Sequence, residues 1–216
     1  MNVKLVSITK PVIDGVNTAE ELVAFCARVS NPSNQYNIET APKLLRYLIK
    51  NKHWSPFEMV SACFEVETSR AIAAQILRHK SLSFQEFSQR YSQATELEPI
   101  EFRMQGETNR QVGDEPAELD INTKIRIEVL QELGMELYND LIEEGVAKES
   151  ARMILPLNTK TTLYMNGTLR SWIHYLEVRT SQHTQKEHRQ IALAIQEILY
   201  KEFPTIKEAL SAEQKL

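Results

Sequence analysis

Glycine is scarce and scattered in this chain, and its placement excludes the best-known nucleotide-binding loops. Only six of the 216 residues are glycine, and none falls into the G-x-G-x-x-G pattern of a Rossmann domain or the G-x-x-x-x-G-K-[ST] pattern of a P-loop. Those loops hold phosphates through backbone N–H groups that a glycine-rich turn exposes. If the chain binds a nucleotide, we therefore expect side chains to hold it.

Cysteine is rarer still, and neither cysteine has the surroundings of a nucleophile. Cys26 lies in an apolar Ala-Phe-Cys-Ala segment and Cys63 in a β-prone Ser-Ala-Cys-Phe segment, with no neighbouring cation to lower the pKa of either thiol. Two cysteines make neither a disulfide framework nor a zinc pattern. His183 and His188 are five residues apart, whereas two ligands on one helix face need a spacing of four. The sequence predicts no metal site and, without G-x-S-x-G, no serine hydrolase.

Long apolar runs and a strong net charge are missing as well. No stretch approaches the ~18 apolar residues of a transmembrane helix, and the opening MNVKLVSITK is too short and polar for a signal peptide. The formal net charge of −4 argues against a dedicated nucleic-acid binder, whose domain is basic. We expect a cytoplasmic protein with no membrane or nucleic-acid partner and, since no linker or repeat is visible, a single domain over residues 1–216.

The apolar pattern predicts a mixture of strands and helices. Strands are expected over residues 2–9, 57–67, 96–104 and 159–165, and helices over residues 18–29, 40–49, 68–79, 124–144, 148–155, 168–179 and 183–200. Pro204 is expected to end the last helix. The long helix over 124–144 carries an apolar stripe, which predicts a core or subunit-interface face. The stripe consists of Leu130, Leu133, Leu137 and Leu141.

The most distinctive polar segment runs from Arg78 to Tyr91 and reads RHKSLSFQEFSQRY. It follows a predicted helix that Thr68 or Ser69 can cap, and it is too polar for a core strand and too rich in serine for a helix. Arginine and serine side chains together provide charge-assisted hydrogen bonds for phosphate oxygens. The segment therefore indicates an anion site, and the alternative is a solvated, charged loop.

The spacing in this segment resembles the signature of the flavin-dependent thymidylate synthases, Arg-His-(Arg/Lys)-x7-Ser, here with Arg78, His79, Lys80 and Ser88. Three further segments resemble other elements of that family in the same order: HWSPFE over 53–58, ARMILP over 151–156, and TLRSWIHYLEVR with TQKE over 168–187. Two positions depart from the family pattern. Lys80 replaces the usual Arg, which keeps the charge but loses the planar guanidinium, and Thr168 replaces the usual Asn.

The resemblance implies a fold and a reaction. The fold is α+β, with a central, mostly antiparallel sheet flanked by helices, long helices packed together, and no Rossmann domain. The reaction is the reductive methylation of dUMP to dTMP, with 5,10-methylenetetrahydrofolate as the one-carbon donor, NADPH as the reductant and FAD as the hydride carrier, so that tetrahydrofolate is released. Members of the family are homotetramers whose active sites combine several subunits, and the resemblance implies the same assembly here.

The resemblance also implies roles for individual residues. Arg179 is the implied catalytic residue, a cation at the N3/O4 edge of uracil that stabilises the ionised ring. The residues implied for dUMP are Gln75, Arg78, Glu86, Phe87, Ser88, Gln89, Arg90, Arg152 and Arg179. The residues implied for FAD are His53, Ser55, Arg78, His79, Lys80, Glu86, Thr168, Arg170 and His174. Ser88 is expected to bind phosphate rather than to act as a nucleophile, because the sequence identifies no activating histidine for it.

Two other functions remain open from the residues alone. One is a non-catalytic nucleotide-binding or regulatory protein that has kept the arginine cluster, and the other is a nucleic-acid-binding α+β domain. A purified protein with flavin absorption near ~450 nm favours the enzyme over both. Because Cys26 and Cys63 have the setting of small buried hydrophobes, the enzyme is expected to work without a thioether between uracil and the protein.

Overall fold

The computed structural model describes residues 1–94, 96–107, 109–110 and 112–213. The strands over these residues are β1 (Asn2–Ile8), β2 (Ser61–Ser69), β3 (Ser83–Glu86), β4 (Arg103–Gln105), β5 (Gly113–Pro116) and β6 (Lys160–Thr168). The α-helices are α1 (Ala19–Ala27), α2 (Ala41–Lys50), α3 (Arg70–Ile76), α4 (Ile121–Glu143), α5 (Lys148–Ala151), α6 (Leu169–Arg179), α7 (Lys186–Glu202) and α8 (Pro204–Glu213). Short 3-10 helices form at η1 (Pro32–Asn34), η2 (Ser55–Met59) and η3 (Arg152–Ile154).

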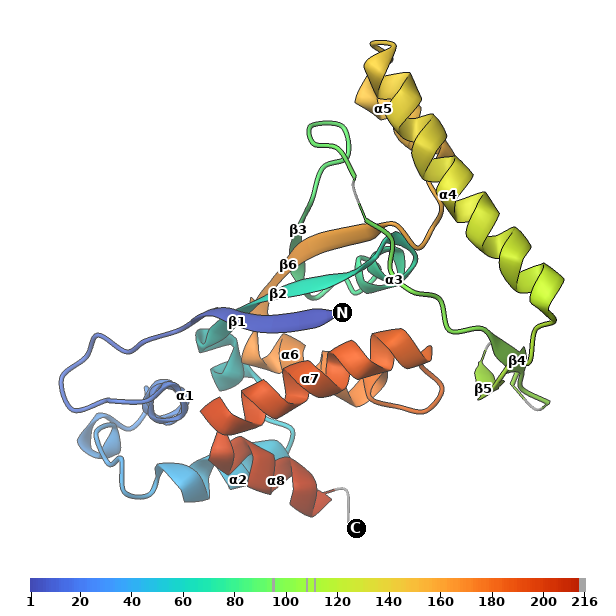
Figure 1. The fold of residues 1–216 in the computed structure, drawn as a ribbon. Coiled ribbons are helices and arrows are strands. Elements are labelled where there is room, and N and C mark those ends of the chain that lie inside the picture. The colour runs from blue at the N-terminus through green and yellow to red at the C-terminus, as the bar shows by residue number, and fades with distance from the viewer. Residues whose placement is uncertain (95, 108, 111, 214–216) are drawn as a thin grey trace.

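A four-stranded antiparallel sheet in the order β1-β2-β6-β3 forms the centre of the described chain, and β4 and β5 make a separate hairpin. Successive side chains of a strand point to opposite faces, so Phe64 and Val66 are buried toward α6 and α7, which lie on one face (Figure 1). The other face is polar: Lys4 Nζ and the Tyr164 hydroxyl each donate to the Glu65 carboxylate at 2.9 Å. The expected α+β fold with an antiparallel sheet is confirmed.

The core lies between the sheet and the helices α6 and α7, which pack against each other. Trp172 of α6 is fully buried, its ring meets Phe64 edge-on with centroids 5.0 Å apart, and its indole N–H donates to the Ala62 carbonyl at 3.0 Å. Ile191 and Ile195 of α7 complete this layer. Burying one such side chain contributes about 1.5–3 kcal/mol, and the layer fixes α6, which carries several of the implied site residues.

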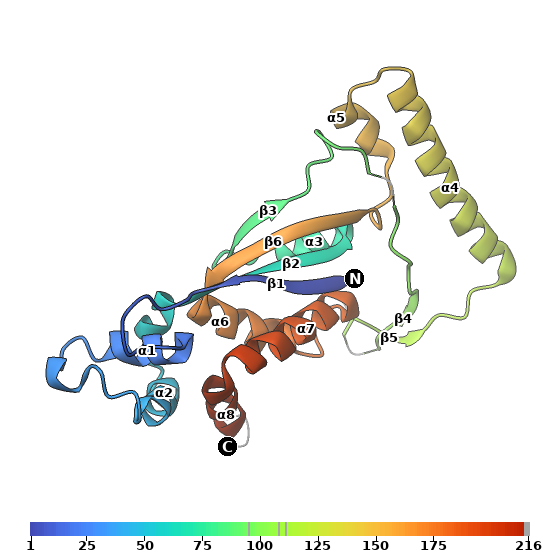
Figure 2. The same ribbon diagram turned by 60° about the vertical axis from the view of Figure 1, so that its left-hand side comes forward.

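Helix α4 stands away from the body of the molecule in both views (Figures 1 and 2). It packs against α5 and η3, and its buried residue Tyr138 accepts a hydrogen bond from the Ala94 backbone N–H at 3.3 Å. The exposed fractions along its stripe are 70% for Leu130, 56% for Leu133 and 46% for Leu137. The stripe is therefore not a core face of this chain, and the interface stays a prediction. Within the described residues, no helix has both the length and the hydropathy needed to cross a bilayer.

The segment from Arg78 to Tyr91 contains a strand that the sequence did not predict. Ser83 to Glu86 form β3, which pairs with β6 in the register Ser83↔Asn166 and Glu86↔Leu163. The polar composition is compatible because β3 is an edge strand, and an edge strand tolerates polar side chains along its exposed side. The segment is too polar for a core strand, as expected, and its strand lies at the edge of the sheet. The alternative of a loop over the whole segment is wrong, because residues 83–86 form β3.

Two helix boundaries also differ from the expectations. Strand β2 continues through Ser69, so α3 starts only at Arg70, and the Ser69 hydroxyl caps it by accepting from the Ile72 N–H at 3.4 Å. At the other end of the chain, α7 stops at Glu202, and Pro204 begins α8 instead of merely ending α7. Proline is well suited to the first turn of a helix because the N–H it lacks has no partner there.

Candidate active site

His53 is held by the turn that ends α2. The His53 N–H donates to the Leu48 carbonyl at 2.8 Å and the Lys52 N–H to the Ile49 carbonyl at 2.9 Å, which is the hydrogen-bond pattern of a Schellman motif. Lys52 sits in the left-handed region with φ +56°, where glycine is usual. The His53 ring is exposed and meets Tyr47 edge-on at 6.0 Å between centroids. The turn thus presents an exposed imidazole at a defined position.

A groove of about 480 Å³ opens between η2 and α6. Its lining includes Trp54, Glu58, Ser81, Arg170, Ser171 and His174. Glu58 organises the groove, since one of its oxygens accepts from Arg170 Nη1 at 2.9 Å and the other from the Thr168 hydroxyl at 2.7 Å. Thr168 in turn caps α6 by accepting from the Ser171 N–H at 3.3 Å. Three residues implied for FAD, Thr168, Arg170 and His174, are brought together here, and Ser55 starts the adjacent η2.

Glu58 is the last residue of the HWSPFE segment, yet the resemblance implied no role for it. The hydrogen bond from Thr168 and the pairing with Arg170 hold the pKa of Glu58 below its usual value, so the carboxylate stays charged at neutral pH. Thr168, which replaces the usual Asn of the family, keeps a side chain that can both cap α6 and donate to Glu58. The signal that could have revealed this contact is a carboxylate in one quoted motif and an arginine in another, although the two are 112 residues apart.

A compact cluster of aromatic and imidazole rings lies next to the groove, on the inner side of α6. The His79 ring is 5.5 Å from the His174 ring and 5.2 Å from the Tyr175 ring, centroid to centroid. The Tyr175 hydroxyl lies 3.1 Å from His188 Nε2. Burial, aided by the positive charge of Arg179, lowers the pKa of His188 to about 4, and burial lowers the pKa of His79 in the same direction. Both imidazoles are therefore neutral at pH 7.

Arg179 completes this cluster from the last turn of α6. Burial raises the pKa of Tyr175, so its phenol remains protonated beside the guanidinium. Among the described residues Arg179 has no carboxylate partner, and its Nε atom is buried without a hydrogen-bond partner. Two further ring nitrogens share this condition, His79 Nε2 and His188 Nδ1. Buried polar atoms are normally satisfied, so three orphans in one cluster mark a place where a polar ligand or water belongs.

The arginines implied for the nucleotide phosphate meet at Glu149 of α5. Arg90 Nε and Nη2 contact one Glu149 oxygen at 3.0 and 2.9 Å, and Arg152 Nε donates to the Glu149 backbone carbonyl at 3.4 Å. Ser88 is exposed and its carbonyl closes the turn that leads to Arg90. Gln89 is buried, with its Nε2 atom unpartnered among the described residues. Ser88, Arg90 and Arg152 thus lie together, as the resemblance implies for a phosphate site.

The remaining implied residues occupy the surface around β3. Glu86 accepts from Arg70 at 2.5 Å and from the Thr161 hydroxyl at 2.9 Å, so one of its oxygens is already engaged. Arg78 and Lys80 are exposed, and neither forms an ion pair with a described residue. Their free charges are available to an anionic ligand.

Phe87 and Gln75 complete the set. The Phe87 N–H extends the β3–β6 ladder by donating to the Thr162 carbonyl at 2.8 Å, and the residue is 36% exposed. Gln75, in the last turn of α3, donates from Nε2 to Gln185 Oε1 at 2.6 Å. Gln185 lies in the TQKE segment that resembles a family motif, yet the resemblance implied no role for it.

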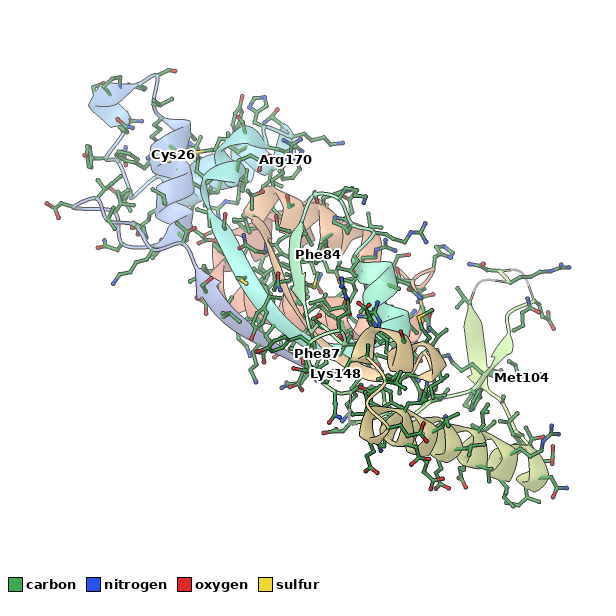
Figure 3. All side chains as sticks on the ribbon, turned by 90° about the horizontal axis from the view of Figure 1, so that it is seen from above. Cys26, Phe84, Phe87, Met104, Lys148 and Arg170 are labelled. Atoms are coloured by element: carbon green, nitrogen blue, oxygen red, sulfur yellow. The ribbon has the colours of Figure 1, made fainter. Side chains whose placement is uncertain are left out.

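Strand β6 separates the two groups of implied residues. Thr168 and Arg170 lie at its C-terminal end, whereas Arg152 lies in η3, just before its N-terminal end. Figure 3 shows Arg170 at one end of the sheet, and Phe87 and Lys148 near the other. A nine-residue strand spans roughly 25–30 Å, so the groove at η2 and the phosphate arginines are far apart within one chain.

Comparisons with known proteins identify a family that this chain resembles over most of its length. The model of the family described as thymidylate synthase complementing protein matches residues 11–205. The chain is 54% identical over 213 residues to a probable flavin-dependent thymidylate synthase of Paramecium bursaria Chlorella virus 1, covering 97% of this chain and 99% of that protein. It is 52% identical over 217 residues to the flavin-dependent thymidylate synthase of a Synechocystis species, again covering 97% and 99%.

The fold has a close counterpart among solved structures. A UMP/dUMP methylase of Streptomyces cacaoi, bound with 5-Br dUMP, superposes with a TM-score of 0.80 at 27% sequence identity, covering 98% of this chain and 94% of that one. The family model, the identity over nearly the full length and the shared fold lead to one conclusion. The chain belongs to the thymidylate synthase complementing protein family, that is, to the flavin-dependent thymidylate synthases.

Proposed function

We propose that this chain methylates dUMP to dTMP with Arg179 as the group that activates the base. The reaction of the family uses 5,10-methylenetetrahydrofolate as the one-carbon donor, NADPH as the reductant and FAD, and it belongs to the biosynthesis of dTMP. The observation that carries the residue assignment is the state of Arg179: a cation with a buried, unpartnered Nε, surrounded by neutral Tyr175, His79 and His188. Such a cation binds an ionised uracil without first releasing a carboxylate.

The electrostatics of this cluster suit the reaction. Uracil becomes nucleophilic at C5 when negative charge develops on the ring, and a preorganised donor beside the N3/O4 edge stabilises that charge. Because His79 and His188 are neutral, neither competes with the guanidinium for the anion, and neither adds a repulsive charge that raises the cost of burying Arg179. Removing one such donor typically costs about 10²–10³ in kcat. We therefore assign the largest single contribution to Arg179.

The residues of the groove fit FAD. His79 Nε2 is a buried polar atom with no partner among the described residues, and Arg170, Arg78 and Lys80 provide exposed charges for a ligand that carries phosphates. We assign His53, Ser55, Thr168 and His174 to the same ligand, and Glu58 as the group that orients Arg170. When bound, FAD supplies the hydride of the reduction; the chain binds it, orients it and limits access of water.

The phosphate of dUMP fits the arginines near the N-terminal end of β6. Arg90 and Arg152 offer guanidinium donors, and Ser88 offers a hydroxyl, all near the N-terminal end of β6. Glu149 occupies part of that position in the free chain, at 2.9 Å from Arg90. A phosphate dianion carries more charge and more acceptor oxygens than one carboxylate, so we propose that it displaces Glu149 from Arg90. We assign Glu86, Phe87, Gln89, Gln75 and Arg78 to the base and sugar of dUMP.

The layout supports a homotetramer whose active sites combine several subunits. FAD and dUMP must meet, yet within one chain the groove and the phosphate arginines lie at opposite ends of a strand of roughly 25–30 Å. The apolar stripe of α4 is exposed, and α4 itself stands away from the body of its own chain (Figure 1). A partner subunit that covers this stripe and contributes the opposite end of its own β6 accounts for both observations.

The test of the proposed function is Arg179→Ala in the FAD-loaded protein. We expect dTMP formation to fall about 10²–10³-fold while FAD stays bound, and Arg179→Lys to recover little because an ammonium lacks the planar fork. Arg46→Ala, which removes an exposed arginine paired with Glu208, serves as the matched control for losing a positive charge. Turnover close to that of the control in Arg179→Ala removes Arg179 from the mechanism.

A further inference from the structure

Four side chains form a hydrogen-bonded chain that runs from the β4–β5 hairpin to the implied nucleotide site. Arg103 Nη2 donates to both Glu187 oxygens, at 2.7 and 2.9 Å. Gln185 Nε2 donates to Glu187 Oε2 at 3.0 Å, and Gln75 Nε2 donates to Gln185 Oε1 at 2.6 Å. Arg103 and Glu187 belong to neither the FAD set nor the dUMP set. Of the four residues, only Gln75 is implied for dUMP.

Glu187 is ionised and can only accept hydrogen bonds. Burial raises the pKa of its carboxyl, but the Arg103 guanidinium and the Gln185 amide outweigh this and hold the pKa below its usual value. The Arg103 side chain is only 9% exposed. It is packed against the start of β5, since a Cβ at Gly113 would lie 2.7 Å from the Arg103 Cβ. The hairpin is tied to the start of α7 a second time by Lys186 and Glu101, at 2.6 and 2.8 Å.

The fixed carboxylate determines which way each amide of the chain points. A glutamine amide has one acceptor end and one donor end. Because Glu187 only accepts, Gln185 must turn its NH₂ toward Glu187, which leaves its oxygen facing Gln75. Gln75 must then turn its own NH₂ toward Gln185. The Oε1 atom of Gln75 is consequently left for a ligand, so the position calls for a ligand group that donates a hydrogen bond.

A deoxyuridine nucleotide offers two donors apart from its phosphate: the N3–H of the base and the 3′-hydroxyl of the sugar. The proposed function places the Arg179 cation at the N3/O4 edge, where the base is ionised. The 3′-hydroxyl is the donor that remains. We propose that Glu187 and Gln185 are positioning residues, which orient the Gln75 amide so that its Oε1 accepts a hydrogen bond from the 3′-hydroxyl of the substrate. This inference rests on the proposed assignment of Gln75 to dUMP.

The test compares the affinities of dUMP and 2′,3′-dideoxyuridine 5′-monophosphate, which lacks only the 3′-hydroxyl, for the FAD-loaded protein by calorimetric titration. A neutral hydrogen bond contributes about 0.5–1.5 kcal/mol, so we expect the wild type to prefer dUMP by about 3–10-fold. Glu187→Gln lets the amides reverse, and we expect this preference to fall to below about twofold. Gln185→Leu interrupts the chain while keeping the Arg103–Glu187 pair, and we expect the same fall.

The ratio of the two affinities is unaffected by a partial loss of folded protein, which a purely structural role of Glu187 would cause. Glu197→Gln, in the exposed pair with Lys201 on the same helix, is the matched control and should keep the wild-type ratio. If Glu86 rather than Gln75 accepts the hydroxyl, Glu187→Gln leaves the ratio unchanged and the inference is wrong. A wild type that binds both nucleotides equally also overturns it. A wild type that binds neither overturns the proposed function itself.

Discussion

The arginines on the rim of the molecule, Arg90 and Arg170, are paired with carboxylates, whereas the more buried Arg179 is not paired with one in the described part of the chain. Arg90 and Arg170 are exposed, and each contacts a glutamate at 2.9 Å. Arg179 lies half-buried among neutral groups, with no carboxylate partner among the described residues. Exposed pairs of this kind contribute about 0–1 kcal/mol, so a ligand anion exchanges for the glutamate at little cost. On the proposed assignments, Arg90 and Arg170 exchange a glutamate for an anionic ligand, whereas Arg179 needs no such exchange to meet the anion that forms during the reaction.

The largest effect is expected from giving Arg179 the partner that it lacks. His188→Glu places a carboxylate in the buried cluster, where the nearby guanidinium favours its ionised form. The paired guanidinium is then neutralised before uracil arrives, and we expect kcat to fall by about 10²-fold or more, with FAD retained. Gln190→Glu adds the same charge at an exposed position of α7 and should leave kcat unchanged. A His188→Glu enzyme as fast as this control contradicts the idea that neutrality around Arg179 matters.

The neutrality of the interior should also appear in the pH dependence of stability. The pKa of His188 is about 4 in the folded chain, against an ordinary value of about 6.5. The unfolded state binds the proton first, so stability is complete above about pH 6.5 and is lost as the pH falls toward 4. Between pH 7.5 and 4.5 this group accounts for about 2–3 kcal/mol of unfolding free energy. His188→Gln removes the titrating group, and urea unfolding at both pH values should show a correspondingly smaller loss.

His79 contributes in the same direction, because burial lowers its pKa too, so part of the acid sensitivity should remain in His188→Gln. A variant with the full wild-type loss between pH 7.5 and 4.5 shows that His188 is not neutral in the folded chain. The phenol of Tyr175 does not titrate in this range, since its pKa is raised above the ordinary value.

On the rim, the effect of removing a glutamate should be small and favourable to the ligand. Glu149→Gln releases Arg90 from a pair whose side chains are 67% and 56% exposed. The phosphate of dUMP then displaces no carboxylate, and we expect an affinity for dUMP about threefold higher, with a change in unfolding free energy below about 1 kcal/mol. Titration with dUMP at two salt concentrations measures the first quantity and urea unfolding the second. Weaker binding of dUMP identifies Glu149 as a contact to the substrate rather than its competitor.

The smallest effect is expected at Lys80, which stands where the family usually has Arg. Lys80 is exposed and has no ion pair with a described residue. Lys80→Arg therefore keeps the charge and adds a planar fork without breaking an existing contact. We expect FAD affinity and dTMP formation within about twofold of the wild type, measured by flavin fluorescence and product assay. A collapse of activity means that the site is built around the shorter lysine.

The sequence predicted the elements whose apolar periodicity is strong. The strands β1 and β6 and the helices α1, α2, α4, α6 and α7 all appear close to their expected places. It failed where local composition and tertiary position disagree: β3 is polar because it is an edge, and α3 is short because Ser69 belongs to a strand before it caps a helix. The strand expected over 96–104 shrinks to the hairpin strand β4. The apolar periodicity of a sequence does not indicate whether a strand will lie at the edge or in the middle of a sheet.

For the site, motif resemblance named cations and hydroxyls but not the groups that hold them. Glu58, Glu149, Gln185 and Glu187 were all present in or beside the quoted motifs, yet each of them has a partner between 59 and 112 residues away. Such contacts depend on the register of β2 with β6 and on the docking of α7. His188 and Tyr175 were missed for another reason: their bond is buried, and sequence gives no direct measure of burial for a histidine.

Strand β6 sets the distance between Arg170 and Arg152, which lie beyond its two ends. One inserted residue would turn Thr161, Leu163 and Met165, all buried now, toward the polar face, because side chains alternate along a strand. Two inserted residues would restore the faces but carry Arg170 about 7 Å farther from Arg152. We therefore expect an insertion in a surface loop to disturb the fold less than an insertion in β6. The length of this nine-residue strand thus fixes the distance between the two groups of residues implied for FAD and for the phosphate of dUMP.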